Sequence, residues 1–259
     1  MRTYLLLFIS IIALGTACAQ ERSFIPKKFE HFTVDLLDNF YGWNDDKLEK
    51  YNSRGEIVAS YSDKSLGSIT YVDASIPSKI LVFHQESGTL LFLDNKLAPA
   101  GNSINLFDKE LFSISLVALL SSNSIALYDV SSQKLIISDL DLNITHTTPC
   151  DFSKDFNPNL INTFLDKEIL LIDQSGLYFF DKFGSFEKRI AITDILSSQL
   201  NKDILFYVRQ DQLYRYDLLT LDMGNISTNV TSIKEFHISN LHLYILDHSG
   251  SIFKQQIKK

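Results

Sequence analysis

The chain has 259 residues, of which 45% are hydrophobic and 21% are charged, and this balance excludes an intrinsically disordered protein. The 19 Phe and 11 Tyr residues favour β structure, because aromatic rings pack well on pleated sheets. The formal net charge of −7 argues against nucleic acid or anionic lipid headgroups as partners of the whole surface.

The first 19 residues have the pattern of a secretory signal peptide, in which Arg2 precedes a short apolar run and then small residues. Two processing sites overlap there. Cleavage after Ala19 is the one we favour; a lipobox-like segment over residues 15–18 would instead leave Cys18 lipidated, although Leu14 lies one position too early for it. Either site predicts an exported protein, periplasmic or associated with the outer membrane, with residues 20–259 as a single domain.

Six polar turns, each between two short apolar runs, recur along the rest of the chain. They begin at Asn44, His84, Asp129, Asp173, Arg209 and Asp247, and their spacings are 40, 45, 44, 36 and 38 residues. A period of about 40 residues built from strand hairpins is typical of a β-propeller, with one repeat per blade. We therefore predict an all-β, six-bladed β-propeller with four-stranded antiparallel blades.

In chain order, short strand-like segments bounded by Asn, Asp, Ser and Gly form the blades. The last blade lacks a fourth strand, and residues 22–27 have no other assignment, so we predict that this N-terminal strand closes the last blade. The polar stretch 149–158 is predicted to be an inserted loop over one face. The predicted blades cover residues 31–61, 69–106, 112–147, 160–192, 195–228 and 233–256.

One hairpin element recurs, in which an aromatic residue ends a strand, Asn or Asp begins the turn and Gly supplies a positive φ. It is found at residues 51–55 and 180–184. In this hairpin pattern residues 22–257 resemble the six-bladed propellers of the broad NHL, YWTD and quinoprotein-like groups, and are most similar to the exported propellers common in Bacteroidota. The resemblance implies the fold and no particular activity. Trp43 is the only tryptophan, so the repeated tryptophans of quinoprotein dehydrogenases are missing and no cofactor is expected.

The sequence contains no G-x-S-x-G, H-E-x-x-H, P-loop or EF-hand motif. The inner strands of a propeller present their ends to a central channel, and the acidic residues nearest those ends are Asp35, Asp38 and Asp73. Among these and the nearby histidines we select His31, Asp35, Asp73 and His237. These four are the candidate channel-mouth residues. One interpretation is a group of His31 and His237 across the channel. The other, which we favour, is that the aspartates form turns and the histidines have backbone or water partners.

A calcium site like that of six-bladed lactonases needs several oxygen ligands from different blades. The matching positions in later blades are Ala118 or Leu119, Leu165 and Gln199, which supply too few, so no metal is expected. Cys150 has no apparent paired histidine and is interpreted as a semi-buried loop residue.

Without a catalytic motif, the sequence favours a non-catalytic interaction or scaffold module of the bacterial cell envelope that binds an envelope protein. Phe152, Phe156 and Phe183 are the docking candidates, although packing between blades is the role that we favour for them. The alternative function is a small-ligand-binding protein or a lactonase-like hydrolase that uses the central channel. At least three polar side chains converging at one channel mouth would favour that alternative.

Overall fold

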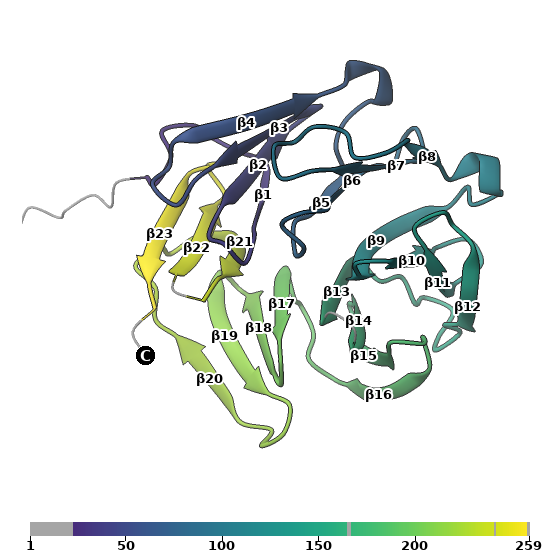
Figure 1. Ribbon diagram of the computed structural model, residues 1–259. Coiled ribbons are helices and arrows are strands. Elements are labelled where there is room, and N and C mark those ends of the chain that lie inside the picture. The colour runs from purple at the N-terminus through teal and green to yellow at the C-terminus, as the bar shows by residue number, and fades with distance from the viewer. Residues whose placement is uncertain (1–22, 165–166, 241, 258–259) are drawn as a thin grey trace, which may run out of the picture.

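The computed structural model describes residues 23–164, 167–240 and 242–257. In these residues the chain forms six antiparallel sheets around a central axis (Figure 1). The described helical elements are two single turns, η1 (Lys64–Leu66) and η2 (Phe107–Lys109), and neither has the length or apolar character to cross a membrane. The predicted all-β, six-bladed propeller is confirmed.

The strands follow one another within each blade in the order of the chain. Blade 1 contains β1 (His31–Val34), β2 (Phe40–Asn44), β3 (Lys47–Tyr51) and β4 (Ile57–Ser62). Blade 2 contains β5 (Tyr71–Asp73), β6 (Ile80–His84), β7 (Thr89–Leu93) and β8 (Ile104–Asn105). Blade 3 contains β9 (Ile114–Ser121), β10 (Ser124–Asp129), β11 (Lys134–Asp139) and β12 (Ile144–Pro149). Blade 4 contains β13 (Leu160–Phe164), β14 (Glu168–Asp173), β15 (Gly176–Asp181) and β16 (Phe186–Ile190). Blade 5 contains β17 (Ser197–Asn201), β18 (Ile204–Arg209), β19 (Gln212–Asp217) and β20 (Met223–Ile226), and blade 6 contains β21 (Ile233–Ile238), β22 (His242–Asp247) and β23 (Ile252–Gln256).

The first strand of every blade lies beside the central axis, and these six strands contact one another in a closed cycle (Figure 1). Residues near the ends of these inner strands form hydrogen bonds between neighbouring blades. Asp73, which ends β5, accepts a hydrogen bond from the N–H of Leu119 at 2.8 Å, and Thr163 of β13 donates to the carbonyl of Leu119 at 2.7 Å. In blades 2, 3 and 4 the C-terminal ends of the inner strands therefore lie together at one mouth of the channel.

The N-terminal segment closes the ring. Ile25 forms an antiparallel bridge with Ile252 of β23, and the N–H of Phe24 donates to the carbonyl of Ile252 at 2.7 Å. Further along, the N–H of Phe29 donates to the carbonyl of Gly250 at 2.9 Å. The predicted pairing of this segment with the last blade is confirmed in residues 23–29, as an isolated bridge rather than a continuous strand.

The hydrophobic core lies between neighbouring blades, because each sheet packs one face against the next sheet. Blades 6 and 1, for example, bury Tyr244 and Phe40 in one cluster. Residues 150–158 form a loop between β12 and β13, as predicted, but Pro149 belongs to β12, and Cys150 and Phe156 are buried between blades 3 and 4 instead of lying over one face. The segment is therefore part of the packing between blades.

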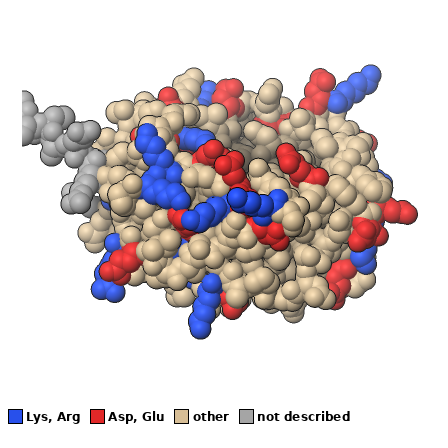
Figure 2. Space-filling view, turned by 90° about the horizontal axis from the view of Figure 1, so that it is seen from above, with Lys and Arg blue, Asp and Glu red and all other residues tan. Residues whose placement is uncertain are grey.

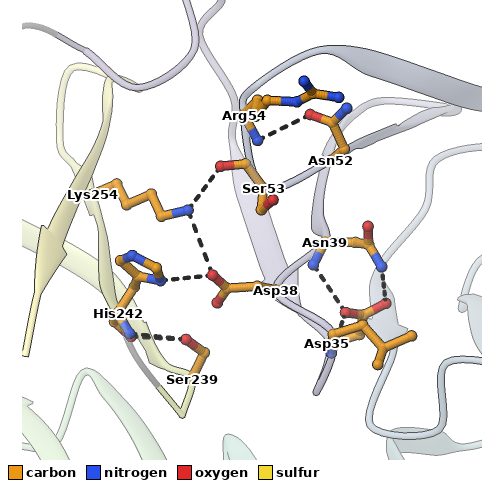
Figure 3. Close-up of polar contacts among 10 residues, drawn as sticks. Asp35, Asp38, Asn39, Asn52, Ser53, Arg54, Ser239, His242 and Lys254 are labelled. Carbon is orange, nitrogen blue, oxygen red and sulfur yellow. Dashed lines mark hydrogen bonds and ion pairs between the residues drawn. The ribbon is translucent and has the colours of Figure 1, made fainter.

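A polar cluster also joins blade 1 to blade 6 (Figure 3). Oδ2 of Asp38, in the β1–β2 loop, lies 2.6 Å from Nδ1 of His242 and 3.5 Å from Nζ of Lys254. Burial by itself would raise the pKa of Asp38, but Ser239, His242 and Lys254 outweigh it and lower that pKa. The carboxylate is therefore charged at neutral pH and attracts the two side chains of blade 6.

A second charged group fixes the N-terminal segment to blade 1. The buried carboxylate of Glu49 accepts hydrogen bonds from Lys27 at 2.7 Å and from Tyr51 at 2.8 Å, and Lys47 lies 2.7 Å away. Burial alone would raise the pKa of Glu49, but these partners outweigh it and lower the pKa to about 2. Lys27 belongs to the closing segment, so this ion pair helps to hold the ring shut.

We predict that Glu49→Gln lowers the free energy of unfolding by roughly 1–3 kcal/mol at neutral pH, because the amide loses the attraction of two ammonium groups. A depressed carboxyl pKa stabilises the fold above the unfolded-state value of 4.5, and this contribution is lost as pH falls toward about 2. The two proteins should therefore converge in stability over that interval, as measured by urea denaturation.

The control is Glu56→Gln, since the side chain of Glu56 is 61% exposed and its contacts with Arg54 and Asn52 are both solvent-exposed. Its effect should stay within about 0.5 kcal/mol. An unfolding midpoint for Glu49→Gln equal to that of the wild type at neutral pH would contradict the assignment.

Candidate ligand-binding channel

A cavity of about 760 Å³ occupies the centre of the ring. It is lined by the first strands of all six blades and by residues that follow them. Cavities of roughly 300–1,000 Å³ are typical of small-molecule sites. The channel is therefore large enough to enclose a ligand.

Alternation along the inner strands decides which side chains face this cavity. In β1, Phe32 and Val34 are buried in the core between blades, so His31 and Thr33 point the other way. In β21, Phe236 and Ile238 are buried in the same manner, which leaves Glu235 and His237 toward the channel. Blades 1 and 6 thus place acid–base side chains next to each other.

His31 and Glu235 form the most developed polar contact of the cavity. Nδ1 of His31 lies 2.6 Å from Oε1 of Glu235, whose Oε2 accepts the N–H of Phe32 at 3.4 Å. The imidazole ring also stacks on Trp43, with 5.5 Å between ring centroids and 24° between planes. An ionised carboxylate can only accept, so Nδ1 donates, and Nε2 of a neutral His31 carries the lone pair.

His237 lies deeper in the channel wall. Burial lowers its pKa to about 4, although Asp35 and Asp38 act in the opposite direction. Its Nε2 lies 3.5 Å from Nε2 of Gln199, an amide that is itself held by the N–H and carbonyl of Ile238 at 2.6 and 2.9 Å. At neutral pH His237 is therefore an uncharged imidazole in a fixed setting.

The two candidate aspartates border the cavity, but their oxygens serve the fold. Asp35 accepts hydrogen bonds from the N–H groups of Leu37 and Asn39, both at 2.9 Å, and from the side chains of Asn39 at 2.8 Å and Tyr41 at 2.9 Å. Asp73 accepts the N–H groups of Ser75 and Leu119, which joins blade 2 to blade 3, and burial raises its pKa. The structure thus brings all four channel-mouth candidates to one cavity and gives the aspartates turn-forming and blade-linking roles.

Several channel residues were not found from the sequence. Glu235 and Trp43 complete the surroundings of His31, and Asn162 donates to Ser198 at 2.8 Å between blades 4 and 5. The alternation in β21 carried a signal for Glu235, because it lies two residues before His237 on the same face. Nothing in the sequence pairs Glu235 with a residue 204 positions away.

The three docking candidates have different surroundings. Phe156 is 1% exposed, and Phe152 is half-buried with its ring 4.7 Å from that of Tyr178. Both therefore pack between blades 3 and 4. Phe183 is 51% exposed and lies 5.5 Å from the ring of His146 on β12.

Two further predictions concern the cysteines and a metal site. Cys150 is fully buried, and burial raises the pKa of its thiol to about 11, which makes it a poor nucleophile. Cys18 lies outside the described residues. Within the described part of the chain, no three His, Cys, Asp or Glu side chains are grouped in a way that could hold a metal ion.

No protein-family model matches the chain, and no curated protein matches it in sequence. Its fold is similar to that of a streptogramin B lyase, with a TM-score of 0.59 and 10% identity over 92% of this chain and 87% of that one. The Pan2 WD40 domain of Neurospora crassa matches with a TM-score of 0.57 and 10% identity over 88% and 89% of the two chains. A catalytically inactive virginiamycin B lyase from Staphylococcus aureus with quinupristin matches with a TM-score of 0.60 and 10% identity over 88% and 80%. At this identity the likeness shows the fold alone: the chain is a β-propeller module.

Because Asp35 and His31 have different surroundings, the structural role of Asp35 can be tested against that of His31. We predict that Asp35→Ala destabilises the protein by about 2–4 kcal/mol, because it leaves four donors without their acceptor. His31→Ala should change stability by less than about 1 kcal/mol, because the His31 side chain is 43% exposed and its contact with Glu235 is partly solvated. Urea denaturation of both variants measures the difference. A fully stable Asp35→Ala protein would return this carboxylate to the list of ligand-binding candidates.

Proposed function

We propose that this propeller binds a small molecule in its central channel, with His31 and Glu235 among the groups that contact it. The observation that supports this most is the carboxylate-bonded imidazole at the wall of a 760 Å³ cavity. A histidine oriented through Nδ1 offers Nε2 to a ligand in a defined direction.

The remaining lining suits a ligand with both polar and apolar parts. Asn162, Ser198 and Gln199 carry amide and hydroxyl groups, while Leu160 and Leu196 are apolar, and all five line the cavity. Sites for small molecules commonly combine an apolar wall with a few placed polar groups. More than three polar side chains line this cavity, which favours a ligand-binding role for the channel over a purely structural one.

Trp43 makes binding directly measurable, because it is the only tryptophan, lines the cavity and stacks on His31. We predict that at least one member of a panel of monosaccharides, small lactones and aromatic fragments changes the emission of Trp43 saturably at millimolar concentration. His31→Ala and Glu235→Gln should each weaken that binding about tenfold or more, the equivalent of one lost charge-assisted contact.

Leu219→Ala serves as the matched control, because Leu219 is 74% exposed in the β19–β20 turn and does not line the cavity. It should leave the titration unchanged. A panel without one saturable response, or binding that both channel variants leave intact, would refute the proposal.

The second candidate is a non-catalytic scaffold of the bacterial cell envelope that docks a partner protein. The observation in its favour is an exposed rim patch of Ile144, His146 and Phe183, where Ile144 and Phe183 are each 51% exposed. Exposed apolar side chains beside an outer strand are typical of protein contacts. Export and envelope association rest on residues 1–19, which lie outside the described residues.

For this candidate we predict that an envelope protein captured by the wild type is lost with Phe183→Ser. Phe112→Ser is the matched control, because Phe112 is 66% exposed on the loop before β9 and its ring packs on Phe107, which is not part of the rim patch. Quantitative mass spectrometry of captured proteins measures both. Equal recovery with the two variants, or no stable partner at all, would remove the scaffold role from this patch.

A further inference from the structure

The channel lining contains acidic residues but no Lys or Arg among the described residues. Its acidic residues are Asp35, Asp73 and Glu235. The chain has 24 Lys and Arg residues, and those on the side of the ring seen in Figure 2 lie next to acidic side chains on the outer surface. The lack of basic residues is therefore a property of the channel rather than of the protein.

The two histidines do not replace the missing cations. His237 is uncharged at neutral pH because burial lowers its pKa to about 4. His31 is bonded to the carboxylate of Glu235 at 2.6 Å, so a proton gained by its ring is balanced by that carboxylate. Neither histidine gives the cavity a net positive charge.

Three lysines of blades 1 and 6 donate hydrogen bonds elsewhere. Nζ of Lys50 donates to the carbonyl of Asn95 at 2.8 Å. Nζ of Lys254 donates to the carbonyl of Ser53 at 2.9 Å and lies 3.5 Å from Asp38 (Figure 3). Nζ of Lys234 donates to the carbonyl of Glu30. None of the three lines the cavity, so none can contact an anion inside it, although Lys50 interacts electrostatically with Asp35.

We infer that the channel is selective for uncharged or cationic ligands and excludes carboxylates and phosphates. This inference rests on the proposed function and specifies its ligand class. An anion that entered would give up its hydration and find carboxylates and neutral dipoles in place of water. A neutral ligand meets amides and hydroxyls that accept or donate, and a cation gains the field of the carboxylates.

Three probes of the same ring and different charge test this selectivity: benzylamine, benzyl alcohol and benzoate. Saturation-transfer NMR at millimolar concentration measures the binding of each to the full chain at neutral pH. Benzylamine and benzyl alcohol should bind, and benzoate should bind at least about tenfold more weakly than benzyl alcohol. Benzoate affinity equal to or greater than that of benzyl alcohol would overturn the inference.

A variant with an added charge tests the cause. Leu196 lines the cavity and is 52% exposed, so Leu196→Lys adds a cation at the channel without removing a buried side chain. It should raise benzoate affinity by about threefold or more, whereas Leu219→Lys, in the same blade but away from the cavity, should not. Benzoate binding that responds equally to both lysines contradicts the inference.

The outcomes separate the two proposals. Binding of all three probes without regard to charge leaves the channel a ligand site and overturns only the selectivity. Failure of all three probes to bind the wild type, together with an unresponsive Trp43, overturns the ligand-binding function and the inference with it.

Discussion

The antiparallel contact between Ile25 and Ile252 joins the two ends of the described chain, and the channel depends on it. A propeller blade buries its faces only between two neighbours, so blades 1 and 6 need each other as much as any consecutive pair does. The same seam contains the pair of His31 and Glu235, which belong to those two blades. If the ring opened, the backbone edge of blade 6 would be exposed and the two halves of the ligand site would separate. The closure of the fold and the geometry of the candidate site therefore depend on the same contacts between blades 1 and 6.

The seam is closed by interactions of different kinds. Backbone hydrogen bonds bind the N-terminal segment to β23, an aromatic cluster around Phe40 and Tyr244 fills the space between the blades, and ion pairs lie at its borders. The apolar cluster supplies the larger share of stability, since burial of two aromatic side chains outweighs a partly exposed ion pair. The charged groups fix orientation instead. Asp38 attracts His242 and Lys254 from blade 6, and Glu49 attracts Lys27 from the closing segment.

Some polar side chains of the channel stabilise the fold, whereas others are positioned to contact a ligand. Asp35 and Asp73 border the cavity, yet their oxygens accept hydrogen bonds from turns and from a neighbouring blade. His31 and Glu235 border the same cavity with 43% and 22% of their side-chain surface exposed, because β1 and β21 present them opposite their buried residues. Carboxylates that are already saturated with neutral donors still contribute negative charge. The structural residues can therefore influence which ligands enter the cavity that they border, even though their oxygens already accept hydrogen bonds from the fold.

The sequence alone determined the blade architecture, because each hairpin turn and each alternating strand is a local pattern of a few residues. It also identified the closing segment, since a blade that lacks a strand leaves an edge that another part of the chain must cover. It placed His31 and His237 near the channel for the same local reason. Only the tertiary structure decided that Glu235 bonds to His31, that Phe156 is buried while Phe183 is exposed, and that the aspartates are saturated by their own turns. These outcomes depend on the angle and register at which one blade packs on the next, and residues 204 positions apart meet only after the ring has closed.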